Sequence, residues 1–200
     1  MPNPIDFYFD FTSPYGYIAS CKIDAIAARH GRQVAWHPFL IGAVFKITGG
    51  VPPMTVPIKG PYHLHDFARS ARFHGVEYRQ PEKFPIAGVV PSRAFYWMDG
   101  RDPARARGIA AALLRAYFVE EIDISDAEQT ITVCAKTGID SGDVRAGIND
   151  PKVKERTKAE VDSAIARGAF GSPYIVVDGE PFWGSDRLDQ VERWLATGGW

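Results

Sequence analysis

The chain has 200 residues, in which 23 basic and 24 acidic side chains are spread without long blocks of one charge. Because the formal net charge is only -1, the composition excludes a strongly basic surface for nucleic acid or an anionic membrane. The first six residues carry no basic segment followed by an apolar run, and no apolar stretch is long enough to span a bilayer, so we expect one compact cytoplasmic protein.

The amino-terminal part predicts a βαβ unit. Residues 5–10 alternate apolar and mixed side chains and are rich in aromatics, which is typical of a central strand. Thr12 or Ser13 caps the next helix, which has Pro14 in its first turn and ends near Gly31. Residues 33–39 then form a second strand, parallel to the first.

The middle of the chain is predicted to be helical, with Pro- and Gly-rich interruptions at 49–61 and 81–91. The expected helices cover residues 62–74, 103–118, 125–138 and 150–168. After Gly168 the pattern changes to strands at 174–177 and 180–183, joined by an Asp178-Gly179 hairpin turn and followed by a helix at 186–196.

This order, βαβ then helices then ββα, predicts an α/β thioredoxin-like fold with a large all-helical insertion. We expect residues 1–39 and 169–200 to form the thioredoxin-like domain and residues 40–168 to form the insertion. The insertion would then supply one wall of a cleft.

Ser13 lies on the strand-to-helix turn where thioredoxin-like redox proteins place a reactive cysteine. Gly16 occupies the position of the second cysteine, so this turn cannot form a disulfide. Cys21 and Cys134 are too few for a disulfide framework, and Cys21 is expected to be a buried core residue of an Ala-rich helix. A reactive thiol must therefore come from outside, which indicates glutathione.

The hydroxyl of Ser13 is predicted to stabilise that thiol as a thiolate. A thiol has an ordinary pKa of about 8.5, and a hydrogen bond to a charged group contributes about 1.5–3 kcal/mol, to which a helix N-terminus adds about 0.3–1 kcal/mol. An alcohol without a neighbouring base is a better donor than nucleophile. The alternative is that Ser13 only caps its helix.

Ser172 and Pro173 form the second part of the predicted site. In thioredoxin-like folds this proline is typically cis, which exposes the backbone of the preceding residue to a peptide ligand such as glutathione. The alternative is an ordinary turn before a strand. Ser185 and Asp186 begin the last helix, where free amides can bind the γ-glutamyl carboxylate and Asp186 its ammonium group; alternatively they only cap that helix.

Lys46 has apolar neighbours, which favours a confined position in which it holds the carboxylate of a substrate; the alternative is a solvated cation. His63 and His65 are two residues apart on a predicted helix and point to different faces. The other three histidines have no ligand-like spacing either, so we predict no metal site.

The whole chain resembles the 2-hydroxychromene-2-carboxylate isomerases and the kappa-class glutathione transferases, which have a DsbA-like thioredoxin fold. The resemblance lies in Phe9 to Tyr15, Gly42 to Lys46, the spaced set Lys59, Tyr62, Asp66 and Arg69, the turn Phe170 to Pro173, and Trp183 to Arg187.

The resemblance implies a role for each matching residue. Ser13 would contact the glutathione sulfur, and Ser172, before the cis-proline, would pair with the glutathione backbone. Lys46 matches an active-site lysine, and relatives are commonly homodimers. The γ-glutamyl end would bind at Trp183, Gly184, Ser185 and Asp186.

The chain departs from the family on the expected substrate side. Related isomerases carry Asn-Arg where this chain has residues 53–56, and a tyrosine near Phe84, which we expect to contact substrate.

The resulting hypothesis is a glutathione-dependent isomerase of hydroxychromene-type aromatic carboxylates that acts by reversible thiol addition. One alternative is a kappa-like glutathione transferase or peroxidase. Another is a non-catalytic thioredoxin-fold module that binds peptides at Ser172 and Pro173.

Overall fold

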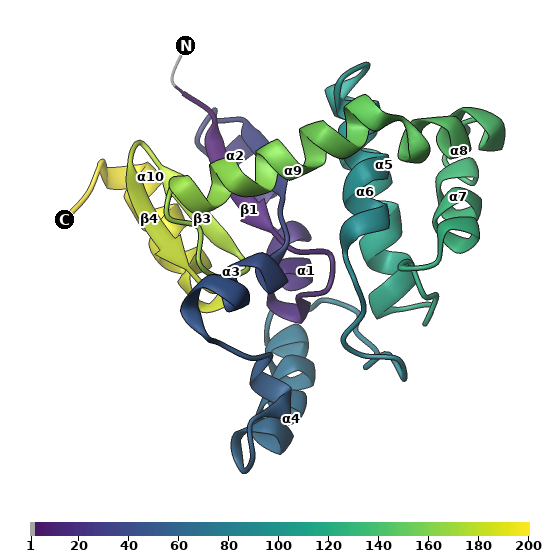
Figure 1. The fold of residues 1–200 in the computed structure, drawn as a ribbon. Helices are drawn as coiled ribbons and strands as arrows, with labels where there is room; N and C mark the ends of the chain where they lie inside the picture. Colours follow the sequence, from purple (N-terminus) through teal and green to yellow (C-terminus); the bar gives the residue numbers. More distant parts are fainter. Residues whose placement is uncertain (1–2) are drawn as a thin grey trace.

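The computed structural model describes residues 3–200, so the first two residues of the expected thioredoxin-like domain lie outside the described part. Its four strands form one sheet in the order β2-β1-β3-β4 (Figure 1). β1 (Ile5–Phe9) runs parallel to β2 (Val34–Pro38), as the βαβ prediction requires. β3 (Tyr174–Val177) lies antiparallel to β1, and β4 (Glu180–Trp183) lies antiparallel to β3.

The turn between β3 and β4 is the predicted two-residue hairpin. Both Asp178 and Gly179 have positive φ, at 52° and 92°, which is the backbone geometry of the tight turn that Asp-Gly favours. The strands on either side have the predicted bounds.

Helices occupy most of the chain between β2 and β3, as predicted. The α-helices are α1 (Pro14–Ser20), α2 (Ile23–Arg29), α3 (Ile41–Thr48), α4 (Lys59–Phe73), α5 (Val89–Asp99), α6 (Pro103–Phe118), α7 (Ala127–Ala135), α8 (Ser141–Asn149), α9 (Pro151–Ala166) and α10 (Leu188–Thr197). Two short 3-10 turns complete the elements, η1 (Pro53–Thr55) and η2 (Ser185–Arg187).

The single helix predicted after β1 is wrong, because the structure has two helices that meet at Cys21 and Lys22. The hydroxyl of Ser20 donates to the carbonyl oxygen of Tyr17 at 2.7 Å, a local bond that competes with regular helix geometry. Cys21 is exposed at this break, which also corrects the expectation that it is a core residue.

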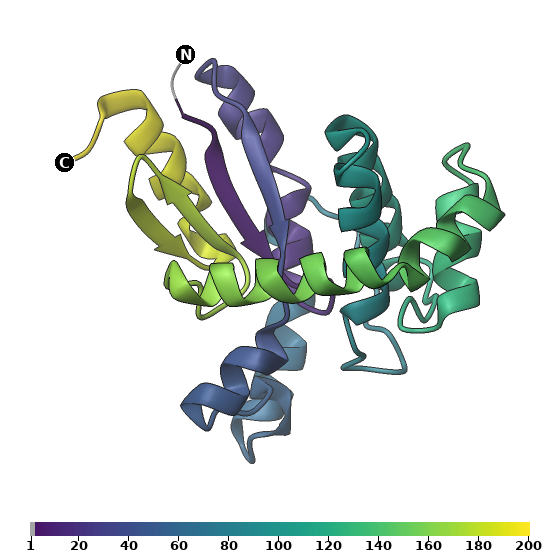
Figure 2. The same ribbon diagram turned by 45° about the horizontal axis from the view of Figure 1, so that its top comes forward.

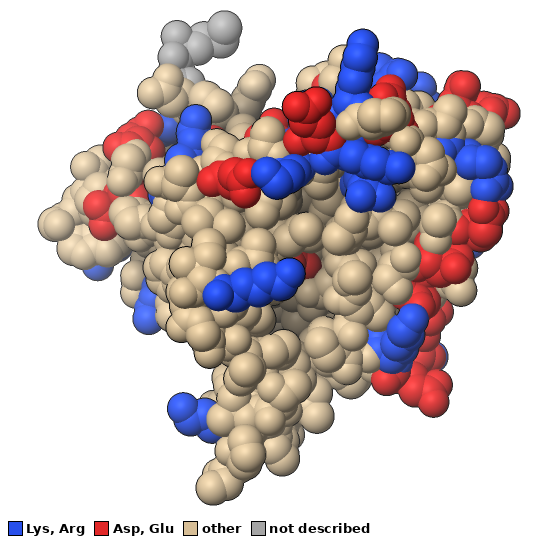
Figure 3. Space-filling model, viewed as in Figure 1, with Lys and Arg blue, Asp and Glu red and all other residues tan. Residues whose placement is uncertain are grey.

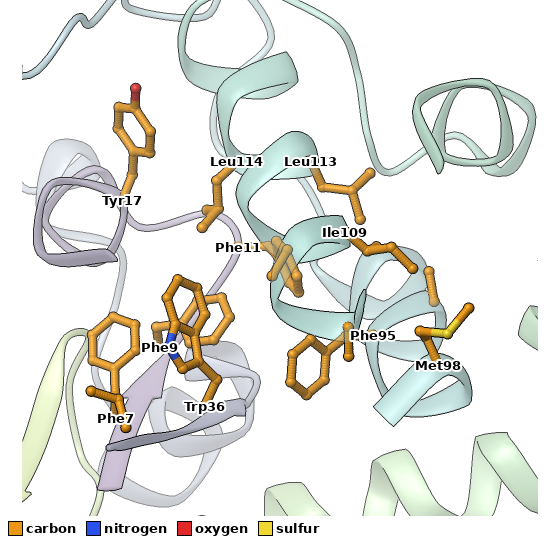
Figure 4. Close-up of a cluster of buried hydrophobic side chains, with 14 of the residues drawn as sticks. Phe7, Phe9, Phe11, Tyr17, Trp36, Phe95, Met98, Ile109, Leu113 and Leu114 are labelled. Atoms are coloured by element: carbon orange, nitrogen blue, oxygen red, sulfur yellow. The ribbon is translucent and has the colours of Figure 1, made fainter. Parts of the chain in front are cut away.

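Successive residues of β1 point to opposite faces of the sheet, and both faces are buried. Phe7 and Phe9 belong to a large cluster that reaches Phe95 of α5 and Leu113 of α6, and Figure 4 shows these side chains between the strands and helices. Tyr8 points the other way.

The opposite face of the sheet is covered by α9. Val161 and Ala164 of α9 pack with Tyr8 of β1 and Tyr174 of β3. Figure 2 shows α9 passing from the strands to α8, so one helix connects the sheet to the helices at the other end of the molecule. The large buried cluster likewise continues from the sheet into α5 and α6. Within residues 3–200, no helix combines the length and apolar character needed to cross a bilayer.

Candidate active site

Ser13 lies at the start of α1, directly after the turn that follows β1. Its Oγ accepts a hydrogen bond from the backbone N–H of Gly16 at 3.0 Å, so it is the N-cap of the helix. The same hydroxyl donates to the carbonyl oxygen of Ser172 at 2.9 Å. The capping role and the ligand-facing role therefore coexist, and the single hydroxyl proton of Ser13 points to the Ser172 carbonyl.

Ser172 precedes Pro173 across a cis peptide bond, and its side chain supports the turn that carries Ser13. The Oγ of Ser172 accepts a hydrogen bond from the backbone N–H of Asp10 at 2.8 Å. A Cβ added to Gly16 would lie 2.6 Å from this Oγ, so the missing side chain at position 16 makes room for Ser172. No backbone bond within residues 3–200 uses the N–H of Ser172.

Asp10 stabilises the turn that carries Ser13, and it is not among the site residues predicted from the sequence. Only 2% of Asp10 is exposed. Its two carboxyl oxygens accept the backbone N–H groups of Thr12 and Ile41, each at 2.7 Å, which joins the turn to the start of α3. Burial raises the pKa of this carboxyl above its ordinary value, against the lowering effect of the two backbone bonds. A carboxylate at the end of an aromatic strand is the sequence signal that could have indicated it.

A groove of about 740 Å³ runs from Ser172 along η2 to α4; because most of the residues that line it are polar or charged, it is called the polar groove below. It brings together most residues predicted to bind glutathione, namely Ser172, Trp183, Gly184, Ser185 and Asp186. Pro173 is buried and does not line the groove, so it contributes to the backbone shape of the site and does not contact a ligand in the groove.

One side of this groove is held by a network around Asp66. Tyr15 donates to its carboxylate at 2.5 Å, and Arg69 forms an ion pair with it. Burial alone would raise the pKa of Asp66, but these bonds hold it below its ordinary value. Arg69 also bonds to the hydroxyl of Tyr62 at 2.7 Å, so three members of the spaced set on α4 are joined.

A second cavity, of about 280 Å³, opens beside Ser13 and is mainly apolar. Its walls include Ile41, Phe45, Pro52, Pro53, Met54, Phe67, Pro85 and Phe170. Four residues line both the cavity and the polar groove: Tyr15, His63, Ser172 and Trp183. The two spaces therefore meet beside Ser13. A further cavity of about 490 Å³ between α5, α6 and α8 contains none of the predicted site residues.

The two residues predicted on the substrate side lie outside the walls of the apolar cavity. Lys46 is exposed, so the expectation of a confined position is wrong. On α3, Phe45 lines the cavity, and the next residue is rotated by about 100° around the helix toward solvent. Phe84 is half-buried and packs against Phe67, with ring centroids 6.0 Å apart, while its neighbour Pro85 reaches the cavity.

Comparison with known proteins places this geometry in a family. The model of the DSBA-like thioredoxin domain matches residues 4–196. The chain belongs to this family. Within it, the chain is 30% identical over 199 residues to 2-hydroxychromene-2-carboxylate isomerase of Sphingobium xenophagum, covering 98% of this chain and 99% of that protein. It is also 28% identical to glutathione S-transferase kappa 2 of Caenorhabditis elegans, covering 98% and 94%.

A solved structure titled 2-hydroxychromene-2-carboxylate isomerase superposes on this DSBA-like chain with a TM-score of 0.85, at 23% identity, covering 97% of this chain and 95% of that one. The predicted resemblance and the thioredoxin-like fold are therefore confirmed. The relatives are isomerases and glutathione transferases, which supports an enzyme.

Proposed function

We propose that the protein is a glutathione-dependent isomerase of hydroxychromene-type aromatic carboxylates. The observation that carries this proposal is the position of Ser13, which lines the apolar cavity and donates its hydroxyl proton to Ser172, a residue that lines both the cavity and the polar groove. A peptide with a reactive thiol fits the groove, and an aromatic substrate fits the cavity. The names of the two relatives support the same pair of ligands.

Glutathione would lie along the groove with its sulfur at Ser13. The unused N–H of Ser172 pairs with the cysteine backbone of glutathione, as an added strand would. Asp186, which is exposed in the groove, takes the γ-glutamyl ammonium group, and Ser185 and Gly184 lie beside it to contact the carboxylate.

The hydroxyl of Ser13 must exchange partners to help the thiolate. A hydrogen bond to a charged acceptor contributes about 1.5–3 kcal/mol, whereas the neutral bond to the Ser172 carbonyl that it replaces contributes about 0.5–1.5 kcal/mol. The net gain of about 1–1.5 kcal/mol lowers the pKa of the glutathione thiol by about one unit.

The cyclic hemiketal of the substrate first opens: the bond between its hydroxyl-bearing carbon and the ring oxygen breaks as the hydroxyl proton moves to the ring oxygen, which leaves a carbonyl conjugated with the double bond. The thiolate then adds to the conjugated carbon, and the former double bond becomes a single bond that rotates. Loss of the thiolate restores the double bond in the other isomer, so glutathione is regenerated as a cofactor. The carboxylate of the substrate extends from the cavity toward solvent, where Lys46 can hold it. Phe84 acts on the substrate side through its contact with Phe67.

The test compares isomerisation of 2-hydroxychromene-2-carboxylate with and without glutathione for the wild type, Ser13→Ala and Ser20→Ala. Ser20 also lies on α1 and bonds within it, so its variant is the matched control. We expect Ser13→Ala to raise the thiol pKa of bound glutathione by about one unit and to lower the rate at neutral pH, with binding retained. Equal wild-type rates with and without glutathione would contradict the proposal.

A kappa-like glutathione transferase or peroxidase is the second candidate, favoured by the kappa-class relative and by the open apolar cavity beside Ser13. Mass spectrometry distinguishes the two, because a transferase releases a stable conjugate of an electrophilic aromatic compound and an isomerase does not. A non-catalytic peptide-binding module would instead retain its principal activity in Ser13→Ala.

We further propose a homodimer that works in the cytoplasm, where reduced glutathione is available. Large apolar side chains on and near α3 and α4 are exposed, including Ile47, Leu64, Phe73 and Ile58, the last with 94% of its surface exposed. α3 and α4 form the lower part of the molecule in Figure 1, and Figure 3 shows few charged side chains on the visible face of that part. Sedimentation of the wild type and Ile58→Asp tests the dimer, which the added charge should weaken.

A further inference from the structure

His63 lies at the boundary between the polar groove and the apolar cavity, and the proposed function assigns it no role. It lies on α4 and lines both spaces, together with Tyr15, Ser172 and Trp183. Its side chain is partly buried, with ring contacts to Tyr62 and Phe67 at centroid distances of 6.0 Å and 6.3 Å. An imidazole is therefore held beside the place where a substrate would meet the sulfur.

The ring of His63 has an unmet bonding requirement. Its Nδ1 is buried and has no hydrogen-bond partner among residues 3–200. Buried polar atoms in proteins are nearly always paired, so an unpaired one calls for a functional explanation. By contrast, the hydroxyl of Tyr15 is committed to Asp66, and the hydroxyl of Ser13 is assigned to the sulfur. His63 is the one histidine among the described residues that line the apolar cavity, and imidazole is the side chain that most often acts as a general acid or base.

The groove that His63 lines also carries charged and titratable groups from four elements. Tyr15 comes from α1, and Asp66, Arg69 and His74 lie on or at the end of α4. Asp186 and Arg187 come from η2, with Asp189 next to them on α10. Asp66 pairs with Arg69 and Asp186 with Arg187, and within residues 3–200 none of these carboxylates lies within ion-pair distance of His63.

We propose that His63 is a catalytic residue that donates a proton to the substrate oxygen on which negative charge develops, an inference that rests on the proposed function. The sulfur–carbon bond forms as the carbon–carbon π bond opens, and its electron pair moves through the conjugated system to the carbonyl oxygen. The imidazolium of His63 gives its proton to this oxygen, forming an enol and a neutral imidazole. After rotation, the imidazole takes the proton back as the carbonyl re-forms and the thiolate leaves.

The environment makes such a donor necessary. A developing oxyanion in an apolar cavity is poorly solvated, and a donor aimed at it is one of the largest contributions to catalysis. Lys46 does not line the cavity. It can hold the substrate carboxylate at the rim, but the enolate oxygen deeper in the cavity requires another group. His63 supplies that group.

The first experiment measures isomerisation as a function of pH for the wild type, His63→Leu, His63→Gln and the control His65→Leu. His65 is exposed on the same helix and lines neither space. We expect His63→Leu to lower kcat by about 10²–10⁴-fold, the usual range for a general acid. His63→Gln keeps a hydrogen-bond donor but cannot exchange a proton, so it should remove the pH-dependent limb that the wild type and His65→Leu share.

For each variant, glutathione binding is measured by calorimetric titration and the free energy of unfolding by urea denaturation. These controls distinguish a lower kcat from a loss of folding. A kcat of His63→Leu within threefold of the wild type, with the same pH profile, would overturn the inference while leaving the isomerase intact. If the wild type shows no glutathione-dependent isomerisation, the proposed function fails separately.

The second experiment decides the inference in that case. It follows the imidazole resonances of the glutathione-bound wild type by NMR as salicylate, an aromatic carboxylate with an ortho hydroxyl, is added. A shift of the His63 resonances, absent for His65, supports contact with the ligand oxygen. Salicylate binding without any change at His63 would refute it, as would the absence of salicylate binding.

Discussion

A methyl group added at Gly16 gives a direct test of how the two halves of the site fit together. The new Cβ of Gly16→Ala would lie 2.6 Å from the Oγ of Ser172, far inside contact distance. Ser172 must then move and release the buried N–H of Asp10, which it now accepts at 2.8 Å. An unsatisfied buried N–H costs about 1–3 kcal/mol, whereas Ala in place of Gly in a helix gains up to about 1 kcal/mol. The net expectation is a loss of about 1 kcal/mol.

The effect should change sign when the obstructing oxygen is removed. Ser172→Ala alone should lower the free energy of unfolding by about 2 kcal/mol, because the Asp10 N–H loses its acceptor. Adding Gly16→Ala to this variant brings no oxygen clash, leaving only a tight 3.2 Å approach to the Cβ of Ser13. The helix preference then dominates, and the double variant should be more stable than Ser172→Ala by up to about 1 kcal/mol.

Equilibrium unfolding in urea of the four proteins measures this double-mutant cycle, with an expected coupling of about 2 kcal/mol. Calorimetric titration with glutathione is the second readout, because a displaced Ser172 also moves the carbonyl that orients Ser13. The reasoning is refuted if Gly16→Ala has the same effect on stability in both backgrounds, since the Ser172 oxygen would then not be what excludes a side chain at position 16.

Three further predictions concern stability and thiol reactivity. Burial raises the pKa of Asp10 above 3.8, so the free energy of unfolding of the wild type relative to Asp10→Asn should be greatest below pH 3.8 and decline as the pH rises through the folded-state pKa. Urea unfolding of both proteins between pH 3 and 8 measures this difference, and a difference that does not change with pH would contradict the prediction. Gly147→Ala should lower the free energy of unfolding by about 1–3 kcal/mol, because its Cβ would lie 2.3 Å from the Trp97 ring, and unchanged stability would contradict this contact. Cys134 is buried and its pKa is raised to about 12 by that burial, so iodoacetamide at pH 8 should label only the exposed Cys21 until urea is added, as peptide mass mapping can check.

Elements with complete local signals could be predicted from the sequence. Helix α6 has the predicted bounds because Asp102 caps it, accepting the N–H groups of Ala104 and Arg105, and Pro103 suits its first turn. Helix α4 begins three residues earlier than predicted, at Lys59, because Pro61 falls in its first turn, where a missing N–H is tolerated.

The division into residues 1–39 with 169–200 and an insertion at 40–168 stays a prediction. One buried cluster extends from Phe7 on β1 to Leu113 on α6, across the expected boundary. Packing of this kind depends on which faces meet in space, so the sequence pattern alone does not reveal it.

The sequence by itself determined the features that depend on residues only a few positions apart. These are the cap at Ser13, the hairpin at Asp178 and Gly179, and the absence of a second cysteine beside Ser13. Short-range hydrogen bonds and backbone preferences decide these features. Only the tertiary structure decided that Ser13 meets Ser172, 159 residues later, and that His63 reaches the junction of groove and cavity while Lys46 faces solvent. Such meetings depend on how packed helices are rotated and which loops close, and the rotation of one residue by about 100° around a helix is enough to move a side chain from cavity to solvent.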